Sequence, residues 1–347
     1  MKKIKLFENA AGLKKKTLVA LCVVLSVILV LLIAVTAFVE YQVGRMGDLD
    51  NSTLSQDEID AILNGETGTG PHMDDSDVNF GTGPVEILDD EHIINILLVG
   101  QDRRKGQGRQ RSDAMILCTL NTKTEKLTMT SFLRDMYVQI PGYRNNKINA
   151  CYMIGGAELL NECLKVNFGI EVDHNVEIDF EGFMKLIDIV GGVEIELTSD
   201  EAGYLNRRGN WDITGNDGWT LKKGVNNLTG SQALAYSRIR AIGTDFQRTE
   251  RQKNVLNALL EKAKKLSITQ VTKLINEAVP LVSTDLEVSD MISYATELLN
   301  MKSNLKVDSL RIPVDGTYSF ADFKGAGDSI VLDFDANIKV LTDALSD

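Results

Sequence analysis

The sequence contains few of the residues that build zinc sites and nucleophilic triads. Its 347 residues include four cysteines and three histidines, and no CxxC spacing or histidine cluster accompanies them. Because zinc sites are built from such groups, we do not expect one here. The histidines His72, His92 and His174 fall outside every motif described below and form no visible Ser-His-Asp triad. We therefore expect them to be structural or surface residues.

The chain also lacks the excess of positive charge that a general nucleic-acid-binding protein needs. Its formal net charge is −12, with 37 lysines and arginines against 49 aspartates and glutamates. A nucleic-acid-binding protein requires a basic face for the phosphates, so this balance argues against nucleic acid as a partner. Gly100, Gly106 and Gly108 form neither a GxGxxG motif nor a P-loop, and alone they indicate nothing.

The composition is nevertheless that of a folded protein. Apolar residues make up 44% of the chain and charged residues 25%, which is ordinary for a globular domain with a buried core. Cys22 lies in an apolar run, which leaves Cys118, Cys151 and Cys163 for that core. We expect three small buried side chains, and one disulfide is the alternative if the domain meets an oxidising environment.

One long segment near the N-terminus contains no charged residue. Residues 17–39 form such a run, and a helix of this length, at about 1.5 Å per residue, spans the roughly 30 Å hydrocarbon layer of a membrane. Lysines precede the run and acidic residues follow it, so residues 1–16 are expected in the cytoplasm and the remainder outside. This predicts a single-pass protein of the cell membrane. A cleavable signal peptide is the alternative, although its apolar stretch is normally only about 7–15 residues.

Residues 40–90 have the composition of an extracytoplasmic stalk. They contain TGTGPH and FGTGP, many acids and few large apolar residues, so they are not expected to bury enough surface to offset the entropy of ordering. Within this segment Ser55 and Glu58 fit a capping box, which predicts a short helix at about 56–63. One folded domain is expected over residues 91–347, with the motifs described below in 93–260.

Apolar runs and helical periodicities alternate from Ile93 onward. The near-continuous apolar run 93–99 predicts a strand that is buried on both faces. Strands alternate with helices, so we expect an α/β fold, a layered α-β-α domain with a central mixed sheet. The order of the strands is not predicted. Further strands are expected at 115–120, 127–132 and 305–312, and helices at 147–166, 180–190, 231–236, 245–266, 268–279, 287–300 and 335–345.

Arginine is concentrated in four short segments of this domain. Nine of the 14 arginines lie in these segments, which span residues 100–113, 131–135, 236–240 and 245–252. The planar guanidinium pairs bidentately with phosphate oxygens, whereas lysine would serve a solvated surface equally well. The choice of arginine therefore predicts recognition of an oxyanion.

The spacing within these segments predicts that some side chains converge. Arg238 and Arg240 are two residues apart, so on an extended strand both would point to one face. An ion-paired strand edge is the alternative for this pair. Arg248, Arg251 and Gln252 have the i, i+3, i+4 spacing of one face at the start of a helix.

Two aspartates supply negative charge among these arginines. Asp102 and Asp113 can together hold Mg²⁺ against bound phosphates, whereas without a metal they would repel an anionic ligand. The plainer alternatives are a turn residue for Asp102 and a cap paired with Arg111 for Asp113. Arg103 and Arg109, in contrast, are expected to be solvated.

Taken in order, these motifs resemble the LytR–CpsA–Psr family. The resemblance covers about residues 93–260 and implies an α/β core whose apolar tunnel holds a polyprenyl chain, behind a single membrane anchor. In one departure, Leu133 stands where the family usually has proline before the Arg-Asp pair. The strings that carry the resemblance are ILLVGQDRRKGQGRQRSDAMILCTLN, SFLRDMYVQIPG, KINACYMIGG, FEGFMKLIDIVGGVEI and GSQALAYSRIRAIGTDFQRTERQKNVL.

The resemblance implies roles for the residues that match its motifs. Asp102 and Asp113 are similar to the family's Mg²⁺-associated acids, and with Arg134 and Arg238 they form the implied catalytic set. The implied pyrophosphate-binding residues are Arg104, Arg111, Arg134, Arg238, Arg240, Arg248 and Gln252.

The implied reaction is a Mg²⁺-dependent phosphoryl transfer from a lipid carrier to the cell wall. A hydroxyl of peptidoglycan, by family analogy the 6-hydroxyl of muramic acid, would attack the phosphorus next to a glycan carried on polyprenyl pyrophosphate in the membrane. Two alternatives stay open. One is hydrolysis of the polyprenyl pyrophosphate, with water as the acceptor, and the other is a non-enzymatic envelope regulator that binds anionic polymers. The glycan itself, teichoic acid, capsule or another polymer, is not predicted.

Overall fold

The computed structural model describes most of the chain beyond residue 46. The predicted cytoplasmic tail and membrane anchor, residues 1–39, lie outside the described residues, so the anchor stays a prediction. Within the described part of the chain, no helix has the length and apolarity needed to cross a membrane. The described residues belong to one compact unit, Met46–Asp347. They are 47, 49–50, 52–66, 68, 72–81, 85, 87–88, 90–101, 103, 107–207, 218–301 and 303–346.

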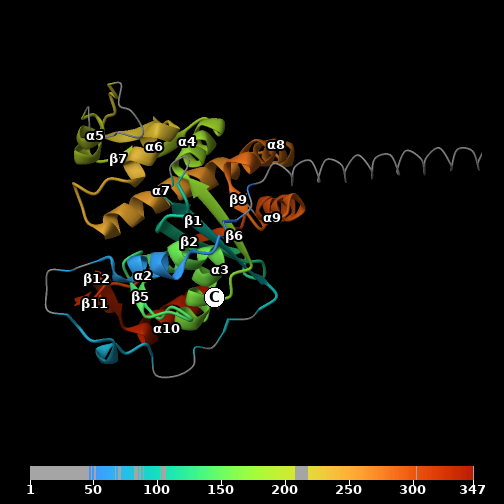
Figure 1. Cartoon of the computed structure of the whole chain (residues 1–347). Coiled ribbons are helices and arrows are strands. Elements are labelled where there is room, and N and C mark those ends of the chain that lie inside the picture. The colour runs from blue at the N-terminus through green and yellow to red at the C-terminus, as the bar shows by residue number, and fades with distance from the viewer. Residues whose placement is uncertain are drawn as a thin grey trace, which may run out of the picture. The chain divides into compact units, whose positions relative to one another are not determined.

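A six-stranded mixed sheet forms the centre of this unit (Figure 1), in the order β10-β3-β2-β1-β6-β9. The pairs β1–β2, β2–β3 and β6–β9 are antiparallel, whereas β6 joins β1 and β10 joins β3 in parallel. The predicted mixed α/β fold is confirmed. The strands are β1 (Ile93–Gln101), β2 (Ser112–Asn121), β3 (Lys126–Phe132), β6 (His174–Asp179), β9 (Ser283–Thr284) and β10 (Lys306–Ile312).

Strand β1 is covered on both faces, as its apolar run predicts. Leu97 and Val99 are fully buried in a hydrophobic core on one side of the sheet. Leu98 and Gly100 line a cavity on the other side. Because successive side chains of a strand alternate between its faces, one near-continuous apolar run supplies apolar side chains to both layers.

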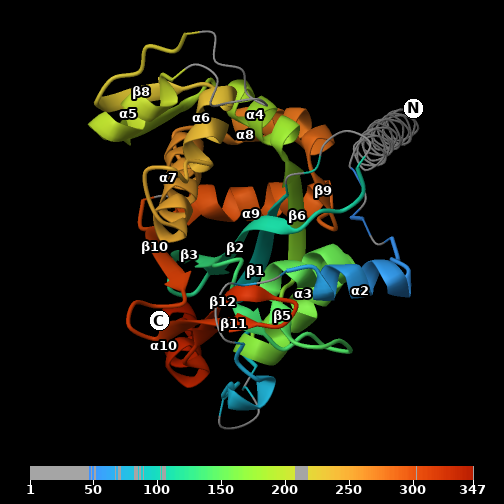
Figure 2. The ribbon, with the colours of Figure 1, turned by 60° about the vertical axis from the view of Figure 1, so that its left-hand side comes forward.

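Three helices cover the face of the sheet to which Leu97 and Val99 point (Figures 1 and 2). The first begins at the capping box of Ser55 and Glu58, which confirms the predicted short helix. Its residues Ile59 and Ile62 are buried in the core, so this part of the segment expected to be a stalk is packed against the domain. Apolar residues at i, i+3 spacing supply the needed surface. The three helices are α2 (Gln56–Asn64), α3 (Ile148–Phe168) and α10 (Phe334–Ser346).

A second layer covers the opposite face of the sheet and has its own hydrophobic core (Figure 2). It is built around α7, which follows a capping box of Thr244 and Gln247, and a two-stranded hairpin. Two further helices lie near β9. This layer comprises α4 (Phe180–Ile189), β7 (Val193–Leu197), α5 (Ser199–Leu205), β8 (Gly224–Leu228), α6 (Gly230–Ser237), α7 (Asp245–Ala263), α8 (Ile268–Ala278), the 3₁₀ turn η2 (Val279–Leu281) and α9 (Val288–Met301).

A second hairpin lies on the side of the sheet that carries α10 (Figure 2). The backbone N–H of Ile330 donates to the carbonyl of Asp135 at 2.9 Å and joins this hairpin to the loop after β3. The hairpin consists of β11 (Tyr318–Phe323) and β12 (Gly327–Leu332). The remaining small elements are η1 (Asp75–Asp77), β4 (Tyr137–Val138) and β5 (Asn146–Lys147).

Helix α3 is kinked at a pair of glycines, and the kink holds a buried arginine. Gly155 and Gly156 leave helical geometry, and Gly156 has φ +66°. The guanidinium of Arg109 donates to the carbonyls of Met153 (3.1 Å) and Ile154 (2.8 Å), just before the kink. The expectation that Arg109 is solvated is therefore wrong, because only 5% of it is exposed. Its partners lie some 45 residues away in sequence.

The three described cysteines are free thiols. Cys151 and Cys163 are buried within α3, as expected, and Cys118 on β2 is half-buried. Burial raises the pKa of the Cys118 thiol to about 12, which keeps it protonated and unreactive at neutral pH.

Replacing Gly156 by alanine tests the kink. A Cβ at this position would lie 2.9 Å from the carbonyl oxygen of Asp50, in a backbone conformation that L-residues rarely adopt. We expect Gly156→Ala to lower the free energy of unfolding by about 1–3 kcal/mol, measured by urea denaturation. Gly203→Ala is the matched control, because a Cβ there meets nothing within 4 Å and should be neutral or slightly stabilising. Equal stability of the two variants would contradict this reading of α3.

Candidate functional site

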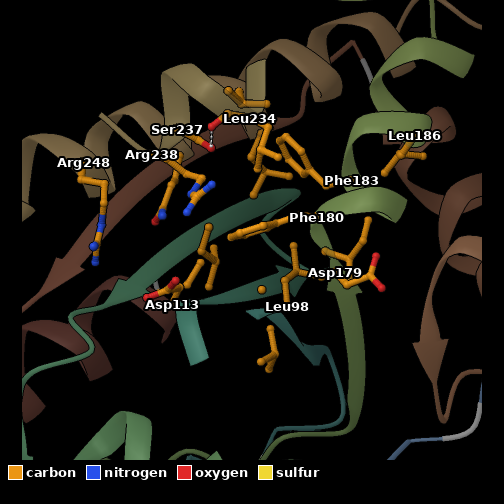
Figure 3. Close-up of a pocket in the computed structure, with 18 of the residues that line it drawn as sticks. Leu98, Asp113, Asp179, Phe180, Phe183, Leu186, Leu234, Ser237, Arg238 and Arg248 are labelled. Atoms are coloured by element: carbon orange, nitrogen blue, oxygen red, sulfur yellow. Dashed lines mark hydrogen bonds between the residues drawn. The ribbon is translucent and has the colours of Figure 1, made fainter. Parts of the chain in front are cut away.

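A cavity of about 780 Å³ lies between the central sheet and the layer of α4, α6 and α7 (Figure 3). Its walls are mostly aliphatic and aromatic, because the cavity faces of three strands oppose the apolar faces of three helices. The sheet contributes Leu98, Ala114, Ile116, Val176 and Ile178. The helices contribute Phe180, Phe183, Leu186, Leu234, Val255, Leu256 and Leu259.

Four arginines and Asp113 gather on one side of this cavity, whereas Asp179, the N-cap of α4, lies on the other side. Figure 3 shows Arg238, Arg248 and Asp113 together there, whereas Phe183 and Leu186 lie on the other side. Arg134, Arg240 and Gln252 also line the cavity. These groups come from β2, the loop after β3, the end of α6 and the start of α7, so the fold brings together segments that lie more than 100 residues apart.

Asp113 is the acidic centre of the arginine cluster. Nη1 of Arg134 donates to Oδ1 of Asp113 at 2.6 Å, and Nη2 of Arg240 lies 3.7 Å from the same oxygen. Nε of Arg134 lies 3.4 Å from the carboxylate of Asp135. Arg134 is thus held between two carboxylates, which fix its guanidinium at the cavity wall.

Arg238 and Arg240 do not lie on a strand, so that part of the prediction is wrong. Arg238 caps the C-terminus of α6 with φ −102° and ψ 0°, and Arg240 follows in a loop. Both nevertheless line the cavity. The guanidinium carbon of Arg238 lies 4.4 Å from the ring centroid of Phe180, a cation–π contact across the cavity wall.

The polar residues at the start of α7 have two different positions, at the cavity and within the scaffold. Arg248 and Gln252 line the cavity, as their i, i+4 spacing predicts. Arg251 instead donates to Oε1 of Glu201 at 2.8 Å and to the carbonyl of Ile239 at 3.0 Å. Because Ile239 lies between the two arginines of the preceding loop, Arg251 holds that loop in place. The helical spacing alone does not separate these roles.

Arg111 lies away from the cavity lining. Its guanidinium donates to Oδ1 of Asn149 at 3.0 Å and to the carbonyl of Ile62 at 3.1 Å, and it lies 3.1 Å from Glu66. These contacts join the start of β2 to α2 and α3. Arg111 is thus outside the cavity lining, although its partner Asn149 donates its backbone N–H to the carbonyl of Arg134 at 3.3 Å.

Asp102 and Arg104 lie outside the described residues. Their neighbours are well placed, because Gln101 at the end of β1 pairs with Ser112, the residue before Asp113. Gln101 also joins the residues before β2 to α3. Its amide group donates to the hydroxyl of Tyr152 at 3.0 Å and accepts from the backbone N–H of Gln110 at 3.3 Å.

The donor set can be tested for its fit to Mg²⁺. Within the described residues, no group of three or more histidine, cysteine, aspartate or glutamate side chains could hold a metal ion. Mg²⁺, however, is usually bound by one or two carboxylates together with phosphate oxygens and water. Asp113, whose carboxylate reaches the cavity, has the oxygen chemistry for such a site and could hold Mg²⁺ only together with a phosphate ligand and a further acid.

A buried acid lies behind the cavity wall. Val176 and Ile178 line the cavity, so Glu177 between them points to the other face of the sheet and is only 2% exposed. Burial raises the pKa of Glu177, although hydrogen bonding with Tyr152 opposes the effect. Sequence reasoning missed this residue, since a single acid in an apolar strand gives no functional signal.

An apolar cavity that ends in arginines is suited to a long apolar ligand with an anionic head group. The chain belongs to the LytR_cpsA_psr family, whose sequence profile matches residues 63–331. The family resemblance carried by the motifs is thereby confirmed.

Relatives with different names are similar to this chain in sequence. Over 282 residues the chain is 30% identical to "Regulatory protein MsrR" of Staphylococcus aureus, covering 80% of each protein. It is also 30% identical over 288 residues to "Polyisoprenyl-teichoic acid--peptidoglycan teichoic acid transferase TagU" of Oceanobacillus iheyensis, again with 80% of each covered. Among solved structures, TagT bound to LIIa-WTA is similar, with a TM-score of 0.59 and 27% identity, and the match covers 78% of this chain and 97% of the solved chain. A further solved structure of TagT, from B. subtilis, is similar as well.

The buried pair of Glu201 and Arg251 gives the stability a pH dependence. Burial alone would raise the pKa of Glu201, but hydrogen bonds from Arg251 and Thr198 outweigh it, so the pKa lies below its usual 4.5. A lowered folded-state pKa means that the pair stabilises the protein above pH 4.5 and that this contribution is lost as the pH falls through the folded-state value.

We expect Glu201→Gln to lower the free energy of unfolding by about 1–3 kcal/mol at pH 7, with a difference that shrinks as the pH falls below about 4.5. Urea unfolding at several pH values measures this difference. Glu181→Gln is the control, because Glu181 pairs with Lys185 on the exposed side of α4 and should contribute less than about 0.5 kcal/mol. A Glu201→Gln penalty that does not change with pH would argue against the ion pair.

Proposed function

We propose that the protein is an extracytoplasmic, membrane-anchored phosphotransferase that moves a glycan phosphate from a polyprenyl-pyrophosphate-linked glycopolymer to peptidoglycan. The observation that carries the proposal is the cavity, in which an apolar body continues into an arginine cluster. The name of TagU and the teichoic acid ligand of TagT support attachment of a cell-wall glycopolymer.

The two parts of the cavity suit the two parts of the proposed donor. An isoprenoid chain has no hydrogen-bonding groups, so it gains from leaving water for a cavity walled by leucine, valine, isoleucine and phenylalanine. The diphosphate carries charge that must be paired when it is withdrawn from water. Arg134, Arg238 and Arg248 offer that pairing at one side of the same cavity.

In the proposed reaction the protein positions the two substrates and neutralises the charge of the phosphates, and it forms no covalent intermediate. The hydroxyl oxygen of the acceptor forms a bond to the phosphorus next to the glycan, and the bond from that phosphorus to the bridging oxygen breaks. Polyprenyl phosphate leaves with the electron pair, and the hydroxyl proton passes to a base or to water. Phosphoryl transfer of this kind depends mainly on alignment and charge stabilisation.

Each described residue has a task in this scheme. Arg134, fixed by Asp113, and Arg238, fixed against Phe180, stabilise the charge that develops on the phosphate oxygens. Arg240, with 54% of its side chain exposed, is able to meet the acceptor side of the phosphate. Asp113 and Asp102 would hold Mg²⁺, which would supply additional positive charge to the phosphates.

A regulatory role is the second candidate, because MsrR carries the name of a regulatory protein. In that case the cavity would bind the lipid-linked polymer without turnover. Hydrolysis of the donor by water is the remaining reaction that the same cluster could catalyse.

The direct test is transfer of labelled glycan from a polyprenyl pyrophosphate donor to peptidoglycan strands. We expect Arg238→Ala to reduce transfer about 100- to 1,000-fold, since one donor to the developing charge is removed. Arg144→Ala, an arginine outside the cavity lining, should leave the rate unchanged.

The outcome with the wild-type protein separates the alternatives. Donor consumption that is equal with and without peptidoglycan would favour hydrolysis. Donor binding without any consumption would favour the regulatory role.

A second prediction concerns the apolar part of the cavity. Leu259 lines the cavity, whereas its neighbour Leu260 on α7 does not. Leu259→Trp fills part of the volume and should weaken binding of a long-chain polyprenyl pyrophosphate about tenfold, with a smaller effect on a short-chain analogue. Leu260→Trp is the matched control, and equal losses in both variants, measured by lipid-binding titration, would contradict an isoprenoid in this cavity.

A further inference from the structure

Three aromatic side chains lie together near the arginine cluster and line no part of the cavity. The ring centroids of Phe246 and Tyr318 are 5.2 Å apart, and those of Tyr318 and Phe320 are 5.7 Å apart at an interplanar angle of 88°. Phe246 belongs to the first turn of α7, and the other two lie on β11. We call these three residues the aromatic ridge.

The ridge ends in an exposed ring. Phe320 is 69% exposed, whereas most large apolar residues of the described chain are covered. A singly exposed apolar side chain is ordinary, but Phe320 continues a row of packed rings, and a ligand that covers it would recover the free energy of exposing the ring to water. Tyr318 beside it packs partly against the main hydrophobic core, which fixes the base of the ridge.

Charged groups surround the base of the ridge. The guanidinium carbon of Arg311 lies 4.4 Å from the ring centroid of Phe246. Arg311 also donates to the carbonyl of Pro313 at 3.2 Å and to the carboxylate of Asp315. Asp315 is 83% exposed at its side chain, so its carboxylate is open to a hydroxyl group at the end of the ridge that carries Phe246.

The ridge is connected to the arginine cluster through the backbone. Phe320 on β11 pairs with Ile330 on β12, and the N–H of Ile330 donates to the carbonyl of Asp135 at 2.9 Å. Asp135 follows Arg134 of the cluster directly. Because neighbouring strands are about 4.8 Å apart, the backbone at Phe320 lies roughly 10 Å from that of Asp135. This is the length of one or two sugar rings.

The exposed end of the ridge, on β11, lies on the other side of the sheet from the cavity, and Phe246 on α7 joins the ridge to the layer that bounds the cavity. The cavity is between the sheet and α4, α6 and α7. In Figures 1 and 2 the β11–β12 hairpin lies on the other side of the sheet, next to α10. Phosphoryl transfer places the attacking and leaving oxygens roughly in line on opposite sides of phosphorus. If the lipid phosphate departs toward the cavity, the attacking hydroxyl must therefore approach phosphorus from the side of the exposed ring.

We infer that the aromatic ridge is a binding subsite for a pyranose ring of the acceptor glycan, an inference that rests on the proposed transfer to peptidoglycan. The apolar C–H face of a pyranose packs on an aromatic face, and its hydroxyl and acetamido groups bond to neighbouring polar side chains. Phe320 supplies the face, and Arg311 and Asp315 supply the polar partners. The ridge thereby positions a glycan strand with one hydroxyl near Arg134.

The test compares two variants that each remove an exposed apolar side chain. Phe320→Ala removes the ring of the ridge, and Val225→Ala changes a residue of similar exposure, 70%, on strand β8. The probe is a soluble, uncross-linked peptidoglycan oligosaccharide, and its binding to the full chain in detergent is measured by calorimetry. We expect Phe320→Ala to weaken binding about tenfold, Phe320→Trp to restore it, and Val225→Ala to have no effect.

Transfer kinetics provide the second readout. For Phe320→Ala we expect the KM for the oligosaccharide to rise about tenfold while kcat and the KM for the lipid donor stay unchanged. Oligosaccharide binding by Phe320→Ala that equals the wild type overturns the inference. A rise in the KM for the donor overturns it as well, since the ridge would then hold the donor glycan.

The binding experiment keeps this inference separate from the proposed function. If the wild-type protein binds the oligosaccharide through Phe320 but transfers nothing to it, the subsite stands and the transferase proposal fails. If transfer occurs and Phe320 has no influence on oligosaccharide affinity, the subsite fails and the transferase proposal stands.

Discussion

The arrangement of this protein depends on holding several guanidinium groups close together at the wall of an apolar cavity. Like charges repel more strongly where water is excluded, so such a cluster needs counter-charges that are fixed in place. Asp113 and Asp135 on either side of Arg134 supply them. These contacts fix the guanidinium of Arg134, and charged groups fixed in this way stabilise developing charge without reorganising, as the proposed transfer requires.

The remaining arginines hold the elements that carry this cluster. Arg251 joins α7 to the carbonyl of Ile239, in the loop between Arg238 and Arg240. Arg109 sits in the kink of α3, so the loop between β1 and β2 is fastened to the opposite layer of the domain. Arginine thus has two uses in the same motifs, one at the cavity and one within the scaffold.

Local sequence patterns are sufficient to predict most helices and strands of the domain. The positions of individual side chains depend on contacts between residues that are distant in sequence. The apolar run of β1 and the spacing of Arg248 and Gln252 were sufficient because each depends on a single element. Arg109 was misjudged because its partners lie on α3, far along the chain. Arg238 and Arg240 converge although they lie on a helix end and a loop, since the packing of α6 on the cavity, and not strand alternation, directs them. No local signal marks Phe320, whose significance comes from its pairing with Ile330 beside Asp135.

The central claim is that one cavity takes both an isoprenoid chain and its diphosphate. The most direct measurement is a crystal structure of the protein with a polyprenyl-pyrophosphate-linked sugar. The account predicts the chain between the sheet and helices α4, α6 and α7, with phosphate oxygens about 3 Å from the guanidinium groups of Arg134, Arg238 and Arg248. A lipid bound outside this cavity, or a diphosphate remote from all three arginines, would contradict it.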